Sequence, residues 1–303
     1  MCPFLILSLD GGGLRGVFEA RLLDLIATHC GRPRFHMVAG TSTGAILGAA
    51  WAMDLDMGEL LEHYLAARES LFQRRFFLGP RLLERAVHSP YQHQRLRALL
   101  RQVFGRRRLS EAGQPLLIPA TDLETSSPLV FSSAAASARD VLAYDAVMAS
   151  CCAPAFFDPF CHHGHLLADG ALYANNPALL AVSAAVGISG ARLGDLRVLS
   201  LGTGHFRQCY HKDIQQWGLA TGWKARTLME FTATLNSEAV CGQVRSLLSS
   251  DHVLRLNFEH TELIASDDFS CGPMLVERAE QCFARHREQI LHLLEQRPEP
   301  YET

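Results

Sequence analysis

The sequence is poor in features that would place the chain in a membrane or outside the cell. No apolar run approaches the ~18 residues that a membrane-spanning helix requires. The first residues, Met1-Cys2-Pro3, provide no basic region ahead of an apolar stretch, so they do not resemble a signal peptide. We therefore expect a cytoplasmic protein, and a peripheral contact with a membrane surface is compatible with that expectation because it needs no span.

Paired cysteines are also missing. The nine cysteines are scattered, odd in number and without a C-x-x-C pair, which argues against a disulfide framework and against a structural zinc site. His162, His163 and His165 form a group that could hold a metal, but no acidic or thiol partner stands at a recognisable spacing. We expect no metal and no cofactor, and we interpret these histidines as a polar turn before a strand.

The net charge is small, at −3, which argues against a partner that is a nucleic acid polymer. One stretch departs from this balance, because residues 68–108 hold eleven arginines against two glutamates. The stretch is either a solvated helical excursion or a surface for lipid head groups or a phosphorylated ligand. The candidate contacts of that second interpretation are Arg74, Arg75, Arg106, Arg107 and Arg108.

Apolar runs of strand length alternate with segments that have helical spacing. Strands are expected at 4–9, 35–39, 116–122, 128–132, 165–168, 196–201 and 252–258. Helices are expected at 17–30, 43–54, 57–70, 144–151, 176–186, 222–249 and 274–294. This alternation predicts a three-layer α/β/α fold around a largely parallel sheet. No repeat or linker divides the chain, so we expect one domain over residues 1–303, completed by a helical part at 205–303.

Two glycine-rich segments each follow one of the first two expected strands. In Asp10-Gly11-Gly12-Gly13-Leu14-Arg15-Gly16, backbone N–H groups at a helix start can hold an oxyanion. Gly40-Thr41-Ser42-Thr43-Gly44 has the G-x-S-x-G form of a nucleophile elbow, a sharp turn from strand to helix that exposes a serine. An oxyanion-binding loop and a nucleophile together favour acyl transfer.

A serine nucleophile needs a base. None of the fourteen histidines stands in an obvious motif. Asp169, in contrast, ends an apolar run and is followed by Gly170, so it could reach a serine at the end of a neighbouring strand. A plain Asp-Gly turn explains the same two residues equally well on local grounds.

In order and spacing, residues 10–16, 40–44 and 169–171 resemble the three signatures of patatin-like phospholipases. Residues 149–157 resemble the small-residue stretch of that family, and residues 199–204 resemble its late strand and turn. The resemblance covers about residues 4–204 and implies a patatin-like fold. We find no specific match beyond it.

The resemblance also implies a Ser–Asp dyad without a catalytic histidine, in which Ser42 is the nucleophile and Asp169 the base. Arg15 would hold the glycine loop or meet a phosphate. The substrate would be a glycerolipid ester at a membrane surface, cleaved without calcium. The expected oxyanion donors are Gly11, Gly12 and Gly13, and the expected supporting glycines are Gly40, Gly44 and Gly170.

Two other interpretations stay open. Residues 11–16 also fit the G-x-G-x-x-G of dinucleotide-binding proteins, although residues 35–40 lack the acid that this motif expects near the end of the second strand. Alternatively, the chain is a non-catalytic relative, or a gated relative that a small molecule activates, as cyclic nucleotides activate some patatin-like effectors. The sequence leaves head group, acyl position, chain length and oligomeric state undetermined.

Overall fold

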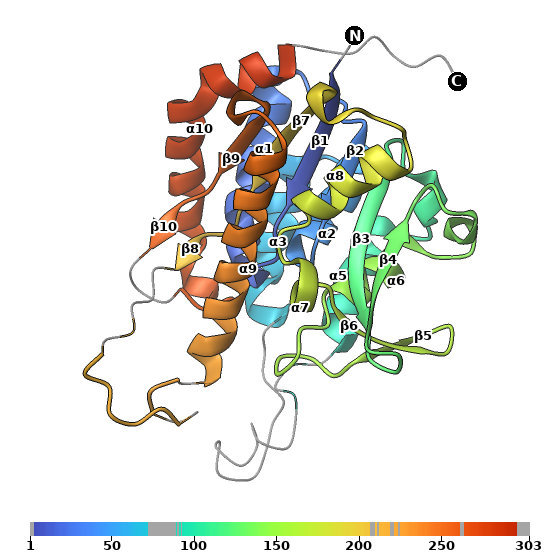
Figure 1. Ribbon diagram of the computed structural model, residues 1–303. Coiled ribbons are helices and arrows are strands. Elements are labelled where there is room, and N and C mark those ends of the chain that lie inside the picture. The colour runs from blue at the N-terminus through green and yellow to red at the C-terminus, as the bar shows by residue number, and fades with distance from the viewer. Residues whose placement is uncertain are drawn as a thin grey trace.

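The computed structural model describes residues 3–71, 89, 91, 93–206, 210, 212–218, 221–223, 225–260 and 264–295 (Figure 1). Its strands are β1 (Phe4–Leu9), β2 (Met37–Gly40), β3 (Leu116–Asp122), β4 (Ser127–Ser132), β5 (Phe160–His162), β6 (His165–Asp169), β7 (Leu196–Leu201), β8 (His205–Phe206), β9 (Val253–Leu256) and β10 (Glu259–His260). Its α-helices are α1 (Gly16–Cys30), α2 (Thr43–Ala52), α3 (Met57–Leu71), α5 (His93–Phe104), α6 (Ala143–Ser150), α7 (Ala171–Ala174), α8 (Ala178–Gly187), α9 (Ala225–Leu247) and α10 (Gly272–Glu295).

One mixed sheet forms the centre of the fold, with the strand order β5-β6-β3-β2-β1-β7-β9 and β4 paired with β3. The pairs from β3 through β2, β1 and β7 to β9 are parallel. The strands β4, β5 and β6 pair antiparallel. The expected α/β class is confirmed. The antiparallel strands extend the parallel part of the sheet beyond β3.

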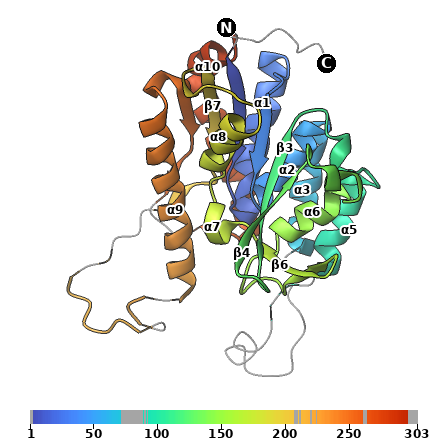
Figure 2. The ribbon, with the colours of Figure 1, turned by 45° about the vertical axis from the view of Figure 1, so that its right-hand side comes forward.

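Helices cover both faces of the sheet, which gives the three expected layers (Figures 1 and 2). The side chains of β1 alternate accordingly, because Leu5, Leu7 and Leu9 belong to one core and Ile6 to the other. The first core is shared with α1, α2, α3, α5, α6 and α10, and the second with α8 and α9. Strand β1 is buried on both faces, which explains its continuous apolar run.

The element bounds lie within three residues of those expected, with a few differences. Strand β9 is shorter than the expected strand at 252–258 and ends at Leu256. The expected helix at 176 begins at Ala178, because Asn176 forms a turn there and its side chain accepts the Ala178 N–H at 3.0 Å. Within the arginine-rich stretch, α5 is a helix whose buried residues are Leu96, Leu99, Leu100 and Phe104. Among the described helices, none is long and apolar enough to cross a bilayer.

The geometry of β3 brings the ends of two other strands together. Strand β4 pairs with residues 117–122 and so occupies one edge of β3. On the other edge, β2 pairs with residues 116–117 and β6 with residues 120–122, in opposite directions. The carboxyl ends of β2 and β6 therefore point at each other across a short gap at Pro119. Ser42 follows β2 and Asp169 ends β6, so this gap sets the place where the two can meet.

Candidate active site

Ser42 sits at a sharp turn between β2 and α2. Its backbone has φ 54° and ψ −119°, a conformation that is costly for a residue with a side chain and that often marks an active site. Two close backbone contacts make the turn possible: a Cβ at Gly40 would lie 2.1 Å from the carbonyl oxygen of Gly44, and a Cβ at Gly44 would lie 2.4 Å from that of Leu9. Glycine at both positions is therefore required by the turn.

The strained turn is held by a buried serine from another element. The Ser42 N–H donates a hydrogen bond to Oγ of Ser150 at 3.0 Å, and Ser150 Oγ in turn donates to the carbonyl oxygen of Pro119 at 2.6 Å. Ser150 ends α6 and is fully buried. The chain of two hydrogen bonds thus ties the nucleophile turn to β3 at the gap between β2 and β6.

Asp169 lies beside Ser42, and only 1% of its surface is exposed. Burial raises its pKa to about 7, although its Oδ1 accepts the Ala171 N–H at 2.7 Å and the neighbouring Ser42 hydroxyl also favours the ionised form. A carboxylate with a pKa near neutrality is a stronger proton acceptor than an ordinary aspartate and is still ionised in part at pH 7. The sequence analysis expected Asp169 to reach Ser42, and the structure places these two side chains next to each other.

The glycine loop borders the same space. The N–H of Gly11 donates to the carbonyl oxygen of Asn175 at 2.9 Å, so this group is already engaged. For the N–H groups of Gly12 and Gly13 we find no acceptor within the described part of the chain. Of the three expected oxyanion donors, Gly12 and Gly13 therefore remain available, whereas Gly11 has a structural partner.

Asp10, the residue before the glycine loop, is held by buried polar contacts. Asp10 forms a two-pronged ion pair with Arg255, with N–O distances of 2.8 and 2.6 Å, and also accepts a hydrogen bond from Ser237 at 3.0 Å. The Asp10 N–H donates to Oε1 of Glu19 at 2.8 Å. Burial raises the pKa of Glu19 well above its usual range, so this carboxyl is held in its neutral form. These contacts fix the position of Asp10, at which the glycine loop begins.

Arg15 closes the loop on its other side. Its guanidinium forms an ion pair with Glu230 at 2.9 Å and donates to the carbonyl oxygen of Ile264 at 3.0 Å. Both partners come from the C-terminal third of the chain, which showed no specific resemblance in the sequence. Arg15 therefore ties α9 and residue 264 to the glycine loop, which agrees with the first of its two expected roles.

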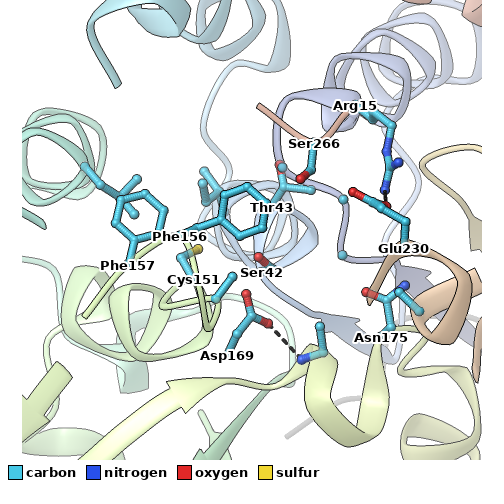
Figure 3. Close-up of a pocket in the computed structure, with 18 of the residues that line it drawn as sticks. Arg15, Ser42, Thr43, Cys151, Phe156, Phe157, Asp169, Asn175, Glu230 and Ser266 are labelled. Atoms are coloured by element: carbon cyan, nitrogen blue, oxygen red, sulfur yellow. Dashed lines mark hydrogen bonds and ion pairs between the residues drawn. The ribbon is translucent and has the colours of Figure 1, made fainter. Parts of the chain in front are cut away.

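Ser42 and Asp169 face a cavity of about 150 Å³. Figure 3 shows Phe156, Phe157 and Cys151 on one side of the pair and charged or amide side chains on the other. The apolar residues Ile46, Leu96 and Ala153 also line the cavity. The polar residues on the other side in Figure 3 are Arg15, Asn175, Glu230 and Ser266. The cavity therefore has an apolar half and a polar half, with the nucleophile between them.

A cysteine, Cys151, also lines the cavity. Burial raises the pKa of its thiol well above the usual value. Because the thiolate is the reactive form of cysteine, this environment keeps Cys151 unreactive at neutral pH.

The structure does not bring together the five arginines that the sequence suggested as contacts for a lipid or a phosphorylated ligand. Arg74 and Arg75 lie outside the described residues. Arg106, Arg107 and Arg108 are exposed and do not line the cavity. Arg108 pairs through its backbone with Leu142, just before α6. Ser150, which contacts Ser42, is the last residue of α6 and lies about 12 Å from Leu142 at ~1.5 Å per residue. These three arginines therefore lie at the far end of α6 from the nucleophile.

His165 does have acidic neighbours, which the sequence spacing did not reveal. Ligand atoms of His165, Asp122 and Glu124 all lie within 4.8 Å of one another. However, Asp122 Oδ2 is paired with His165 Nδ1 at 3.0 Å, and its Oδ1 accepts the N–H groups of Glu124 and Thr125. These hydrogen bonds of a turn account for the proximity of the three side chains.

Sequence reasoning missed four residues that hold the site together. Ser150 was visible only as part of a small-residue stretch, and Asn175 only as a residue before a helix. Glu230 and Arg255 carry no local signal, because a charge within a helix or strand usually faces solvent. Their roles depend on tertiary contacts alone.

Comparison with known proteins gives consistent results. The chain is 28% identical to the cUMP-AMP-activated phospholipase of Escherichia coli over 264 residues, which cover 81% of this chain and 78% of that protein. It is 27% identical to Patatin-like protein 2 of Oryza sativa subsp. indica over 263 residues, which cover 71% of this chain and 64% of that protein, so part of the rice protein has no counterpart here.

Among solved structures, the crystal structure of VipD from Legionella pneumophila matches 97% of this chain and 67% of VipD, with a TM-score of 0.51 and 13% identity. At this identity the match supports the fold alone. The sequence model of the family described as patatin-like phospholipase matches residues 7–182, which is more than half of the chain. The chain therefore belongs to the patatin-like phospholipase family.

Proposed function

We propose that this protein is a serine lipid acyl hydrolase of the phospholipase A type, with Ser42 as nucleophile and Asp169 as base. The observation that carries the proposal is that Ser42, in a strained turn, and the buried Asp169 lie side by side at a cavity that is apolar on one side (Figure 3). Family membership supports the reaction class. The dyad and its mechanism are inferred from the geometry.

In the first half of the reaction, Asp169 accepts the Ser42 hydroxyl proton while Oγ attacks the ester carbonyl carbon. Negative charge develops on the carbonyl oxygen, and the N–H groups of Gly12 and Gly13 are the donors available to stabilise it. The start of α2 adds a favourable helix dipole. Asp169 then protonates the leaving alcohol or lysolipid as its C–O bond breaks, which leaves an ester between Ser42 and the acyl group.

In the second half, a water molecule replaces the alcohol. Asp169 accepts a proton from this water, whose oxygen attacks the acyl carbon. The fatty acid leaves when the bond to Ser42 Oγ breaks, and the proton on Asp169 returns to that oxygen. One carboxylate thus serves both steps and ends in its starting state.

The two halves of the cavity suggest how a lipid would bind. Phe156, Phe157 and Ile46 offer an apolar surface for an acyl chain. Arg15 and Glu230 lie on the other side, where a polar head group would be placed. The substrate is therefore proposed to be a glycerolipid or phospholipid ester at a membrane surface, which the protein contacts peripherally from the cytoplasm.

A backbone loop and a carboxylate supply every role in this mechanism, so we propose that the reaction is independent of calcium. Hydrolysis should then continue in EDTA at an unchanged rate. A loss of activity in EDTA that Ca²⁺ restores would contradict the proposal.

The decisive experiment tests both members of the dyad on a water-soluble ester. Ser42→Ala should abolish hydrolysis and labelling by a fluorophosphonate, whereas the exposed Ser246→Ala should change neither. Asp169→Asn should lower the rate by about three orders of magnitude, because the amide cannot accept the proton. Retained activity in Ser42→Ala, or a histidine that proves indispensable to the chemistry, would refute the dyad.

A second candidate function is a hydrolase that stays inactive until a small molecule binds. One relative, of which this chain covers 78%, is named for its activation by cUMP-AMP. The contact between Arg15 and Glu230 offers a route for such control, because it links the glycine loop to a helix of the C-terminal third. The two candidates share the same dyad and differ in their resting activity.

The activity of the purified protein without additions distinguishes the two candidate functions. Purified protein that hydrolyses vesicle lipid without additions supports a constitutive enzyme. Negligible hydrolysis that rises on addition of cUMP-AMP or another cyclic dinucleotide supports the gated form, provided that Ser42→Ala gives no response.

A further inference from the structure

Four aromatic side chains gather at the beginning of α9, the end of this helix that also contributes residues to the cavity. We call Tyr210, Trp217, Trp223 and Phe231 the aromatic cluster. Its ring centroids lie 5.7 Å apart for Tyr210 and Trp217, 5.4 Å for Tyr210 and Trp223, 5.4 Å for Tyr210 and Phe231, and 5.1 Å for Trp217 and Trp223. Both tryptophans are exposed, Trp217 at 42% and Trp223 at 37%. Residues 210–223 were not assigned any role by the sequence.

The tryptophans are held together by a turn of the backbone. The N–H of Gly222 donates to the carbonyl oxygen of Gln216 at 2.8 Å, and the N–H of Trp223 donates to that of Gly218 at 3.1 Å. Tyr210 adds a hydrogen bond from its hydroxyl to the carbonyl oxygen of Trp223 at 3.3 Å. Figures 1 and 2 show this segment projecting from the body of the fold beside one end of α9.

Two exposed leucines lie on α9 and on the neighbouring helix α7. Leu235 follows Phe231 by one helical turn on α9 and is 52% exposed. Leu172, on α7, is 53% exposed and directly follows the cavity residue Ala171. Helices α7 and α9 are in contact, because Asn236 donates to the carbonyl oxygen of Tyr173 at 3.3 Å.

The cavity and the aromatic cluster lie at the same end of α9. Glu230 and Ala233, in the first turns of α9, line the cavity, and Phe231 stands between them in the sequence. Exposed apolar side chains that form a patch, rather than occurring singly, indicate an interaction surface. The patch therefore lies at the end of the molecule where the cavity is.

We propose that the aromatic cluster, with Leu172 and Leu235, inserts into the lipid–water interface and places the cavity mouth on the membrane. The proposal rests on the proposed lipid hydrolase function and identifies the surface through which the substrate would enter. Tryptophan and tyrosine are the side chains that favour this interface, since each combines an apolar ring with a polar group. The cluster also fits a lipid better than a planar ligand, because its rings already contact one another.

The chemistry of the surface predicts how binding depends on salt. Across residues 210–231 the charged residues are Lys212, Asp213, Lys224, Arg226 and Glu230, which give a net charge of only +1. Binding should therefore be driven by apolar insertion and persist at high ionic strength, whereas contact through arginines would weaken as salt screens it. Zwitterionic vesicles should bind without any requirement for anionic lipid.

The three tryptophans of the chain make the insertion directly observable, because Trp51 is fully buried and Trp217 and Trp223 are exposed. Ser42→Ala protein is mixed with phosphatidylcholine vesicles whose acyl chains carry bromine, a quencher of tryptophan fluorescence at short range. Quenching and a blue shift are expected at both low and high salt. In a Trp217→Gln, Trp223→Gln variant, the remaining Trp51 should not respond.

The same double variant should bind vesicles about tenfold more weakly or worse, since the inserted apolar area is lost. Ile188→Gln is the matched control. Ile188 is 70% exposed, but it follows α8 and precedes β7, so it lies near the amino ends of the strands, whereas the cavity lies at their carboxyl ends. This control should bind as wild type does. Melting temperatures of all variants establish that each is folded.

Three results would overturn the proposal: no quenching of wild type, vesicle binding that the double variant retains, or binding that high salt abolishes. Dimerisation without vesicles that the double variant loses would assign the surface to a second copy of the chain instead. Hydrolysis of a soluble ester by wild type is measured in parallel. An active enzyme that fails to insert refutes this surface alone, whereas absence of hydrolysis on any ester refutes the proposed function.

Discussion

Ser42 and Ser150, which are 108 residues apart in the sequence, are joined by a hydrogen bond from the backbone N–H of Ser42 to the side-chain oxygen of Ser150, 3.0 Å long. The same oxygen donates its proton to the carbonyl of Pro119. Pro119 occupies the gap on β3 between the ends of β2 and β6. A buried serine therefore couples the strained nucleophile turn to the strand that also positions Asp169.

Ser150→Ala should lower kcat by about 10²-fold with a small change in KM, because the Ser42 N–H loses its acceptor and the nucleophile shifts within its turn. The buried N–H left unsatisfied should also cost about 1–3 kcal/mol of stability. Ester kinetics and urea unfolding of the same samples measure both effects.

Ser133→Ala provides the matched control. The oxygen of Ser133 also accepts a backbone N–H, that of Leu116 at 2.8 Å, but at the start of β3 and away from Ser42. It should affect stability with little effect on kcat. Equal losses of kcat in both variants would mean that Ser150 acts through the general stability of the sheet.

Several features of this fold could be predicted from the sequence because local patterns determine them. The strands Phe4–Leu9, Leu116–Asp122 and Leu196–Leu201 have the expected bounds, since a run of apolar residues bounded by turn residues is already a strand signal. The glycines of the elbow were also readable, because a tight turn needs them whatever surrounds it. The α/β class and the family followed from these signals.

The supporting contacts could not be predicted in the same way. That Gly11 is bonded to Asn175, and that Arg15 is paired with Glu230, depends on how α9 and the segment after β6 pack against the loop. The register of β3 decides that β2 and β6 share an edge, and no short pattern encodes this. Residues 72–88, which include Arg74 and Arg75, lie outside the described residues, so the arginine-rich segment stays a prediction.

The pH dependence of hydrolysis should follow Asp169. Burial raises its pKa to about 7, and the base must be ionised to accept the Ser42 proton. Consequently kcat/KM on a soluble ester should rise with pH through about 7 and level off above it. A rate that stays constant from pH 5 to 9, or that falls through neutrality, would contradict the assignment of Asp169 as base.

Glu19 should tolerate glutamine but not alanine. Burial raises the pKa of Glu19 well above its usual range, and its Oε1 accepts the Asp10 N–H. Glutamine keeps that acceptor and is uncharged, whereas alanine leaves the N–H unsatisfied and should cost about 1–3 kcal/mol. Thermal unfolding of Glu19→Gln and Glu19→Ala measures the difference.

The pH dependence of Glu19→Gln stability has a definite sign. A carboxyl with a raised pKa in the folded state favours folding at low pH and loses this contribution as pH rises above its unfolded value toward its folded value. Glutamine has no such loss, so the melting temperature of Glu19→Gln relative to wild type should increase from pH 4 to pH 8. A relative melting temperature that decreases over this range would show that Glu19 is ionised in the folded protein.

Removal of Arg255 should destabilise the protein strongly, although this residue lies beyond the family match. Its guanidinium is the charge partner of Asp10, and both side chains are buried. Arg255→Met leaves a carboxylate buried without its partner, which typically costs about 3–5 kcal/mol. Urea unfolding should therefore show a much lower midpoint, and ester hydrolysis should fall because Asp10 directly precedes the glycine loop.

The exposed pair of Arg192 and Asp195, with an N–O distance of 2.8 Å, is the control. Arg192→Ala should cost about 0–1 kcal/mol, since solvent already screens that pair. The partner variant Asp10→Asn, combined with Arg255→Met, should recover much of the lost stability, because the unpaired charge is then absent. If Asp10→Asn fails to rescue Arg255→Met, the loss arises from packing around Arg255 rather than from the unpaired carboxylate of Asp10.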